Sequence, residues 1–355
     1  MKSTRFLACL APFFVALSAH AATETWDKTT NTTWDTTTAN WTGALTTFTN
    51  GDDAVFSSAT GNNALTLGAS GVTAGNILSN AALTPTTLTI TGVTTAGLTL
   101  GTGVAGTGNI GADAAGSTSY AQAITYNGVA LSGTGFLTLA SGSGPSGTPT
   151  IWNMASGKTF LLTAGTANQL VELNSNTVNL TGAGTVKIQG GAKIQNGTFN
   201  VNSGVLSLAG SGSRNTTVNN SVTVNVATGA SLNVSKNSGV GSVFGQNTVL
   251  AVGAILRQEA GTAASQSTTN SGLITVNDVA TIDNAATSGS SANFTLSGVI
   301  SGAGGLTSQA PPDLPRILRA PTPIQAPPPS PPEWGNSPRR PRSTTIRPPR
   351  GRRPT

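Results

Sequence analysis

The sequence predicts an all-β fold: a right-handed parallel β-helix (β-solenoid) of short strands, followed by a disordered C-terminal tail. Three observations support this prediction. Short runs of alternating apolar and polar residues recur through residues 22–307, separated by Gly, Asn, Ser or Thr. The same region has no apolar stripe of helical period. From Gln309 onward the chain is rich in proline and arginine and cannot continue such strands.

The alternating runs are three to five residues long, so none could form a stable sheet alone. Three such strands can instead make one coil of roughly 20–25 residues that pairs with the next coil. On the order of 12–14 coils would bury a thin column of Val, Leu, Ile and Phe, while outward Thr, Asn and Ser form ladders. A β-sandwich would bury more large side chains than a chain with 5% aromatic residues provides. The runs are Leu65–Leu67, Leu88–Thr91, Phe136–Leu139, Val178–Leu180, Val186–Ile188, Phe199–Val201, Val205–Leu208, Val222–Val226, Leu232–Val234 and Ile274–Val276, with turns at Gly190-Gly191 and Asn196-Gly197.

Residues 1–21 have the pattern of a secretory signal peptide. Lys2 and Arg5 precede a short apolar stretch, and Ala19-His20-Ala21 has the small-x-small form of a cleavage site. This stretch is too short to span a bilayer, and no later window approaches ~18 unbroken apolar residues. We therefore expect export across the inner membrane and no transmembrane segment in the mature chain.

Removal of this peptide would remove the only cysteine, Cys9, and the only histidine, His20. The mature chain could then form no disulfide and would have no thiolate nucleophile or imidazole base. Ser-His-Asp and Cys-His catalysis and histidine–cysteine zinc sites are thereby excluded. We expect no cofactor, no metal site and no catalytic residues.

The first part of the expected mature chain is unusually aromatic. Three of the five tryptophans, Trp26, Trp34 and Trp41, lie within sixteen residues, and the segment Asn50–Phe56 follows them. Because the first coil of a solenoid must be covered, we expect residues 22–60 to form an aromatic cap and residues 61–307 the solenoid repeats. A platform that stacks on sugar rings is the functional alternative.

The formal net charge of +6 arises from the tail. Residues 310–355 hold nine arginines against Asp313 and Glu333, which gives +7 and leaves −1 for residues 1–309. A nucleic-acid-binding surface would need basic residues clustered on a folded face. A nearly neutral body makes nucleic acid an improbable partner.

Leu296–Thr307, which reads Leu-Ser-Gly-Val-Ile-Ser-Gly-Ala-Gly-Gly-Leu-Thr, resembles the opening of the autotransporter-associated β-strand repeat. The Trp-Asp pairs and Asn50–Phe56 resemble the start of the passenger regions that carry this repeat. The resemblance covers residues 22–307. It implies a passenger β-helix displayed outside a Gram-negative cell and anchored by a C-terminal transmembrane β-barrel, which no segment after residue 307 resembles.

In that family the repeat leads into further strands that contain an Asn-Thr-Tyr-Thr-Gly segment. Here the chain continues as Ser-Gln-Ala-Pro-Pro from residue 308. Read from the third base of each codon, Ala320–Trp334 is compatible with Thr-Asn-Thr-Tyr-Thr-Gly-Ala-Thr-Thr-Val-Ser-Ala-Gly-Val, which contains that segment. We therefore expect residues 308–355 to be a disordered, Pro/Arg-rich, out-of-frame tail, with the shift between Thr307 and Ala320.

The resemblance implies a non-catalytic passenger fragment that acts as a β-helical stalk or adhesin, with surface glycans or other cells as partners. The intact family is found at the cell surface or outside the cell. A copy without the barrel would be periplasmic or secreted. Two alternatives remain: a β-helix enzyme that acts on polysaccharide as a lyase or hydrolase, and a free secreted adhesin complete at this length.

Few residues in the body could carry chemistry. Asp52-Asp53 is the best carboxylate pair, although neighbours on a strand point to opposite faces, and a solvated turn with local hydrogen bonds is favoured over a weak calcium site. For a polysaccharide lyase, the nearest approach to a site is Asp278 and Asp283 with Arg257 and Glu259 one coil away.

Two short motifs imitate nucleotide-binding loops. Ser156-Gly-Lys-Thr159 has the end of a phosphate-binding loop, but its first required glycine is replaced by Trp152. A catalytic Ser156/Lys158 pair is the functional alternative, and a strand turn fits the local pattern better. The glycines at 106, 108 and 111 copy a dinucleotide fingerprint in a chain that has 44 glycines.

Overall fold

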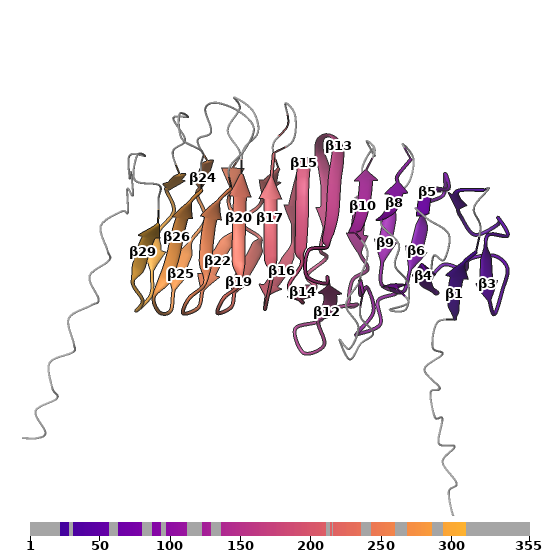
Figure 1. The fold of residues 1–355 in the computed structure, drawn as a ribbon, viewed down its shortest axis with the longest axis horizontal. Helices are drawn as coiled ribbons and strands as arrows, with labels where there is room; N and C mark the ends of the chain where they lie inside the picture. The colour runs from indigo at the N-terminus through magenta and orange to yellow at the C-terminus, as the bar shows by residue number, and fades with distance from the viewer. Residues whose placement is uncertain are drawn as a thin grey trace, which may run out of the picture. The chain divides into compact units, whose positions relative to one another are not determined.

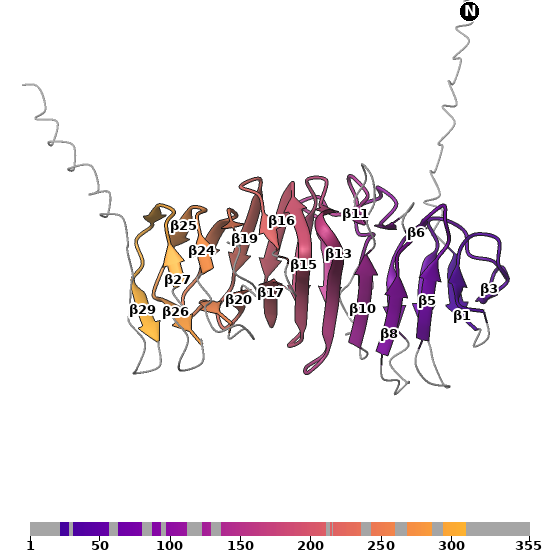
Figure 2. The same cartoon turned by 90° about the horizontal axis from the view of Figure 1, so that it is seen from above.

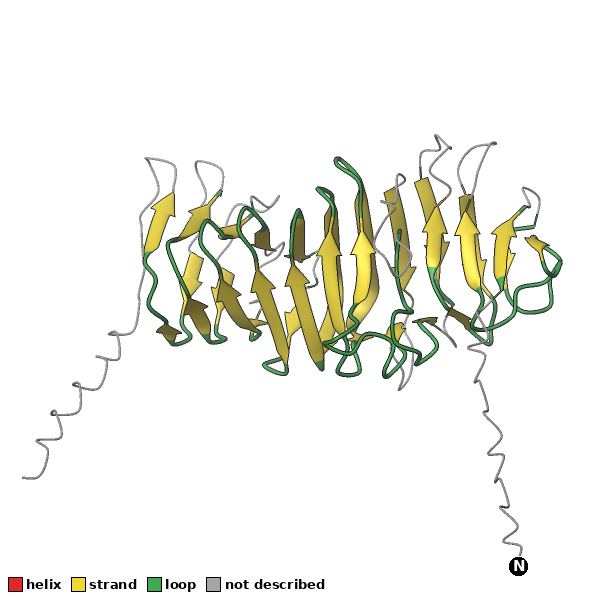
Figure 3. Cartoon of the chain, turned by 90° about the horizontal axis from the view of Figure 1, so that it is seen from below, coloured by secondary structure: helices red, strands yellow, loops and turns green. Residues whose placement is uncertain are grey.

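A computed structural model describes residues 22–27, 31–56, 63–79, 87–93, 97–111, 123–128, 136–210, 214, 216–235, 243–259, 268–285 and 294–309. They all belong to the first of two units, Met1–Thr322 and Pro323–Thr355. Their regular elements are all β-strands (Figure 3), which confirms the all-β prediction. None of these residues forms a helix long and apolar enough to cross a membrane. The predicted signal peptide and the tail beyond Gln309 lie outside the described residues.

Parallel strands lie on three faces, to which successive coils contribute (Figure 1). The first face has eleven strands: β2 (Thr33–Trp34), β5 (Asn63–Leu67), β8 (Thr87–Thr91), β10 (Ala123–Gly128), the first part of β13 (Thr159–Glu172), the first part of β15 (Thr185–Gln195), β17 (Val205–Ala209), β20 (Ser231–Ser235), β23 (Ile255–Gln258), β26 (Ala280–Asn284) and β29 (Leu306–Gln309). The second face has β6 (Val72–Ala74), β9 (Leu98–Leu100), β11 (Leu137–Leu139), the second parts of β13 and β15, β18 (Thr217–Val218), β21 (Val243–Phe244), β24 (Thr268–Asn270) and β27 (Phe294–Leu296).

The third face has β1 (Thr23–Trp26), β4 (Asp53–Phe56), β7 (Ile77–Ser79), the bridging residue Ile110, β12 (Thr150–Asn153), β14 (Thr177–Thr181), β16 (Gly197–Val201), β19 (Val222–Val226), β22 (Asn247–Leu250), β25 (Ile274–Val276) and β28 (Ile300–Ser301). A further strand, β3 (Trp41–Gly43), pairs with β1 in the antiparallel direction. All other strand pairs among the described residues are parallel. The predicted parallel β-solenoid is therefore confirmed.

Coils of the predicted length occur in the C-terminal part of the solenoid, and longer coils precede them. Leu206 pairs with Val186, twenty residues earlier, and with Leu232, twenty-six residues later. By contrast, Leu88 pairs with Ile124, thirty-six residues on. In the longer coils, the extra residues lie in the sequence between the strands. The eleven strands of the first face are consequently fewer than the expected 12–14 coils.

Two strands exceed the predicted length of three to five residues. β13 has 14 residues and β15 has 11, because each runs around the corner from the first face to the second as one strand. Their pairing shifts register between Ala164 and Gln169. Gly190 has a φ of 83°, and a Cβ there would lie 2.4 Å from the oxygen of Ala164. The predicted turn at Gly190-Gly191 is therefore wrong, since these glycines bend a continuous strand. The turn at Asn196, with a φ of 61°, is confirmed.

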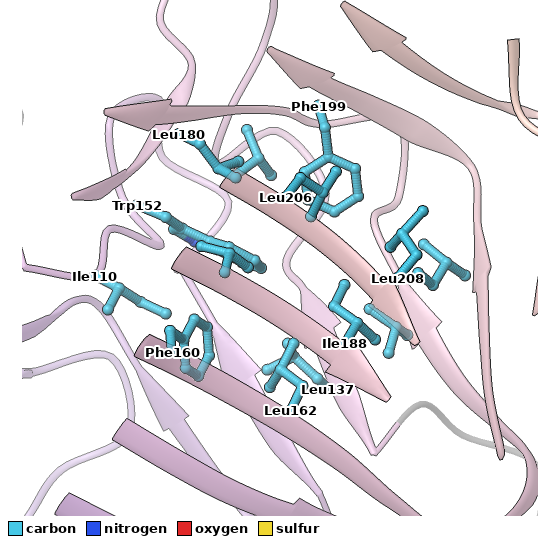
Figure 4. Close-up of a cluster of buried hydrophobic side chains, with 14 of the residues drawn as sticks. Ile110, Leu137, Trp152, Phe160, Leu162, Leu180, Ile188, Phe199, Leu206 and Leu208 are labelled. Atoms are coloured by element: carbon cyan, nitrogen blue, oxygen red, sulfur yellow. The ribbon is translucent and has the colours of Figure 1, made fainter. Parts of the chain in front are cut away.

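A continuous apolar column fills the space between the faces. In-register positions on the first face are occupied by Phe160, Val186, Leu206, Leu232, Leu256 and Ile282. The third face contributes Trp152, Leu180, Val201, Val226, Leu250 and Val276. All twelve side chains are at most 3% exposed. Figure 4 shows Trp152 beside Phe160, with ring centroids 5.3 Å apart. The predicted apolar column is confirmed.

Aromatic rings fill the first coil. Trp26, Trp34, Trp41, Phe48 and Phe56 are at most 5% exposed, and the rings that contact one another have centroids 4.8 to 6.4 Å apart. β3 lies beyond β1 at this end (Figure 2) and pairs with its outer edge. β3 thus covers the outer backbone edge of β1, and the rings fill the interior of the first coil. The alternative of a sugar-stacking platform is wrong, because the indole faces are buried.

Asp35 holds the turn that follows β2. Its Oδ1 accepts hydrogen bonds from the backbone nitrogens of Thr37 at 2.9 Å and Thr38 at 2.6 Å, and its Oδ2 accepts one from Thr38 Oγ1 at 3.0 Å. Burial acts to raise the pKa of Asp35, but these hydrogen bonds favour the carboxylate and leave the pKa below its ordinary value of 3.8.

The glycines of Leu296–Thr307 lie where one coil touches the backbone of the coil before it. A Cβ at Gly298 would come within 1.9 Å of the oxygen of Gly272, and one at Gly302 within 2.2 Å of the oxygen of Val276. Close stacking of coils therefore accounts for glycine at these positions. The last strand, β29, runs to Gln309, two residues past the predicted boundary at 307.

Asp35 should make a pH-dependent contribution to stability. Because its pKa is lower in the folded state than in the unfolded state, its contribution is complete above about pH 4 and is lost as the pH falls through the folded pKa. Carboxyl NMR titration should place the Asp35 midpoint below 3.8. The stability difference between wild type and Asp35→Asn should shrink as the pH falls below about 4. A midpoint at or above the ordinary value would contradict this.

Gly298→Ala should lower the free energy of unfolding by about 1–3 kcal/mol, because the new methyl group overlaps the preceding coil. Urea denaturation measures the change. Gly305→Ala is the matched control, since the nearest atom to its added Cβ would be Val279 Cγ2 at 4.0 Å. Equal losses in the two variants would show that close stacking does not explain the motif.

Candidate functional site

The Asp52-Asp53 pair is divided between the two sides of the third face. Asp52 is 8% exposed, and its Oδ1 accepts a hydrogen bond from the backbone nitrogen of Ala22 at 3.1 Å. Asp53 Oδ1 accepts one from Asn76 Nδ2 at 2.7 Å. The burial pattern confirms that the two side chains point to opposite sides. The favoured solvated turn with local hydrogen bonds is wrong for Asp52, which is buried and bonded to a residue thirty positions away.

Metal ligands do not gather at this pair. Calcium is held by six to eight oxygen atoms, usually several of them from carboxylates. Across the described ranges, no three or more His, Cys, Asp or Glu side chains are grouped so that they could hold a metal ion. The carboxylates of Asp52 and Asp53 each serve the fold instead, by bonding to a neighbouring strand or loop.

A line of polar and charged side chains crosses five coils on the outside of the first face. They share one register and are Lys187, Ser207, Asn233, Arg257 and Asp283. Arg257 Nε donates to Asp283 Oδ2 at 2.7 Å. This charged line contains one of the residue pairs that the sequence placed one coil apart, Arg257 and Asp283.

Glu259 follows β23 and reaches back over the charged line. Its Oε1 accepts a hydrogen bond from Asn233 Nδ2 at 2.8 Å, and its Oε2 accepts one from Ser207 Oγ at 3.0 Å. Lys187 Nζ lies 3.8 Å from Glu259 Oε2. The sequence analysis grouped Asp278 with these residues, but Asp278 lies in the turn after β25, where its Oδ1 accepts from the nitrogen of Val279 at 2.7 Å.

The charged line balances its charges internally. Cleavage of a glycosidic bond by hydrolysis ordinarily uses two carboxyl groups that flank the bond, one as an acid and one as a base or nucleophile. Here Asp283 is paired with Arg257, and Glu259 is held by Ser207, Asn233 and Lys187. The arrangement fits an ion-pair network that joins coils up to three steps apart.

The motifs that imitate nucleotide-binding loops are turns. Lys158 N donates to the oxygen of Ala155 at 3.0 Å, and Gly157 has a φ of 71°, so this segment turns the chain into β13. Gly106 and Gly108 also have positive φ values, 83° and 81°. Such conformations are ordinary for glycine in tight turns. The predicted strand turn at residues 156–159 is confirmed.

An open groove of about 500 Å³ crosses the corner between the second and third faces. It is lined by polar residues from the turns and strand ends of successive coils: Ser141, Glu172, Asn174, Ser175, Asn196, Gly197, Thr198, Ser221 and Thr223. Of these, the sequence had indicated only the turn at Asn196-Gly197. Alternation of apolar and polar residues predicts strands, and it does not predict such a groove, because turns and strand ends form the walls of the groove.

Glu172 is the charged group of this corner groove. Its Oε1 accepts a hydrogen bond from the nitrogen of Asn174 at 2.9 Å, and its Oε2 accepts from Gln195 Nε2 at 2.7 Å and Asn196 Nδ2 at 3.2 Å. The carboxylate is thus oriented by amide donors from two coils. Hydrogen-bonding groups held in this way can bind hydroxyl groups of a ligand without reorganising.

The backbone takes a left-handed conformation at three of the residues that line the groove. Asn174, Ser175 and Asn196 have φ values of 48°, 61° and 61°. Asparagine is among the few residues that tolerate this conformation. Beneath them, the buried side chain of Asn176 donates to the oxygens of Ala140 at 3.0 Å and Leu173 at 2.8 Å. The corner is consequently fixed by buried hydrogen bonds.

An asparagine ladder runs along the outside of the third face. Asn179, Asn200 and Asn225 share a register. Asn200 Nδ2 donates to Asn179 Oδ1 at 2.8 Å, and Asn225 Nδ2 donates to Asn200 Oδ1 at 2.8 Å. The predicted stacking of outward polar side chains is confirmed. Asn200 and Asn225 also line a second, smaller depression of about 250 Å³.

Comparison with known proteins gives no relative from which a function could be carried over. No family model, no curated protein and no solved structure matches this chain. The resemblance to autotransporter passengers therefore stays an expectation that rests on the quoted residues. The corner groove, the charged line and the asparagine ladder are the features from which a function can be inferred.

The asparagine ladder should show a position-dependent energy. Asn200→Ala removes a donor and an acceptor bond, whereas Asn225→Ala removes only its bond to Asn200. With about 1 kcal/mol for each hydrogen bond, the central substitution should cost about twice as much as the terminal one. Urea denaturation of both variants measures the ratio. A ratio near one would mean that the ladder bonds contribute nothing to stability.

Proposed function

We propose that the protein is a non-catalytic, exported autotransporter passenger that acts as a stalk and as an adhesive surface for glycans. The observation that carries this proposal is the register of the three faces, which is kept from coil to coil over the described residues. Such a stack is stiff and offers the same polar rows to its surroundings at each step. These properties suit a spacer that holds a binding surface away from a cell.

The corner groove supports glycans as the ligand class. Its lining is made of hydroxyl, amide and carboxylate groups, which pair with sugar hydroxyls as donors and acceptors. It is open along the coils, so that a linear chain of sugar rings could lie along it. None of the described residues that line it is aromatic, so stacking of these residues on sugar rings would contribute nothing to affinity. We expect weak binding that gains strength when many copies act together.

A polysaccharide-cleaving enzyme is the second candidate, and the charged line is the observation that favours it. It places Arg257, Lys187 and two carboxylates on one outer face. The non-catalytic proposal is preferred because each of these carboxylates already accepts hydrogen bonds from protein donors. Release of reducing ends from a polysaccharide, abolished by Glu259→Gln, would favour the enzyme.

Thr223→Trp should abolish binding to glycans, because the indole would fill the corner groove from β19. Thr275→Trp is the control, since Thr275 is also partly exposed on the outside of the third face but does not line the groove. Binding of the purified full chain to a glycan array, displayed in many copies on beads, measures the difference. Unchanged circular dichroism would show that both variants are folded.

Two results would count against this proposal. If no glycan is bound by wild-type protein at high bead density, the adhesive role is wrong. If Thr223→Trp and Thr275→Trp bind equally well, the corner groove is not the binding surface.

A further inference from the structure

We propose that the chain is cut between Ala21 and Ala22, and that the carboxylate of Asp52 holds the new α-ammonium group of Ala22. This inference rests on the export part of the proposed function, because the cut accompanies export. Asp52 belongs neither to the corner groove nor to the charged line, and this inference assigns it a role. It also identifies the residue that receives the end of the mature chain.

Ala22 is held at both of its backbone polar groups. Its nitrogen donates to Asp52 Oδ1 at 3.1 Å, and its oxygen accepts from the nitrogen of Asp53 at 2.8 Å. β1 begins at the next residue, and Thr23 pairs with Asp53 in parallel register. Among the described residues, the pairing of the first coil therefore starts at the residue that the cut would place first.

The sequence selects the same nitrogen atom independently. Ala19-His20-Ala21 has small residues at the first and third positions, the form that places an export cleavage after the third residue. The bond that would break is thus the amide bond to the nitrogen of Ala22. The atom that faces Asp52 in the fold is the atom that the cleavage pattern would free.

The carboxylate of Asp52 can accept more hydrogen bonds than a single amide N–H can donate. Asp52 is 8% exposed, and its Oδ2 is buried without a hydrogen-bond partner among the described residues. A buried charged oxygen without a partner destabilises the folded state. An amide nitrogen offers one proton, whereas an ammonium group offers three together with a positive charge. The ammonium could satisfy both oxygens of Asp52 through charge-assisted hydrogen bonds.

The cut balances as a simple hydrolysis. An export peptidase adds one water molecule across the Ala21–Ala22 bond, so the C–N bond breaks. Ala21 leaves as the carboxylate end of the released peptide. The nitrogen of Ala22 gains hydrogen and is protonated near neutral pH. The neutral donor facing Asp52 is thereby replaced by a cation, and a lone buried charge becomes an ion pair.

The first test determines the end of the exported chain. The full gene is expressed in a Gram-negative host, and the N-terminus of the exported protein is read by Edman sequencing and intact mass. We expect Ala22. A chain that still begins at Met1 and stays in the cytoplasm would overturn the export on which the proposal rests. An exported chain that begins elsewhere would overturn this inference and leave export intact.

The second test is a double-mutant cycle in the full gene. Insertion of one glycine between Ala21 and Ala22 should leave the cut after Ala21 and make the inserted glycine the first residue, so that Ala22 regains an amide nitrogen. Asp52→Asn is introduced with and without this insertion, and mass spectrometry confirms each N-terminus. Asp52→Asn should lower the thermal midpoint by about 2–4 °C more in the chain that starts at Ala22. Equal losses in both backgrounds would overturn the ion pair.

A third measurement needs no substitution at Asp52. The α-amine of the exported wild-type chain should react with an acylating reagent on the order of tenfold more slowly than that of the glycine-inserted chain, because the paired ammonium stays protonated. Peptide mapping separates this reaction from that of the lysines. Equal rates would overturn the proposal even if Asp52→Asn failed to fold.

Discussion

Parallel backbone pairing between consecutive coils is the constraint on which the other features depend. It fixes the distance from one coil to the next, and every outward or inward position is then repeated at that spacing. The apolar column from Phe160 to Ile282 and the asparagine ladder from Asn179 to Asn225 are two results of the same register. Where the backbones of two coils lie too close together for a Cβ atom, as at Gly298, only glycine fits.

Much of the fold could be predicted because alternation of apolar and polar residues reports directly on the two sides of a strand. The run Val222–Val226 is a strand whose valines are buried, as its pattern indicated. The long strands β13 and β15 could not be predicted, since a bend by glycine and by a register shift leaves no break in the extended backbone. Glycine pairs such as Gly190-Gly191 therefore have two structural meanings that the local sequence does not separate.

The candidate sites were harder to predict than the fold. Pairs of residues one coil apart, such as Arg257 and Asp283, could be brought together from the coil length alone. The corner groove joins residues from turns whose geometry depends on left-handed asparagines, and no simple period describes them. The burial of Asp52 could not be predicted either, because it depends on where the first strand begins in relation to the fourth.

Strand pairing and ring packing differ in extent from coil to coil, and this affects the order in which the coils unfold. Backbone pairing joins each coil only to the coil before it and the coil after it, so stability is mostly a sum of local terms along one dimension. The section around β13 and β15, with their many paired residues and the rings of Trp152, Phe160 and Phe199, would be the last to melt. Under a force applied at either end of the stack, the protein would unfold one coil at a time.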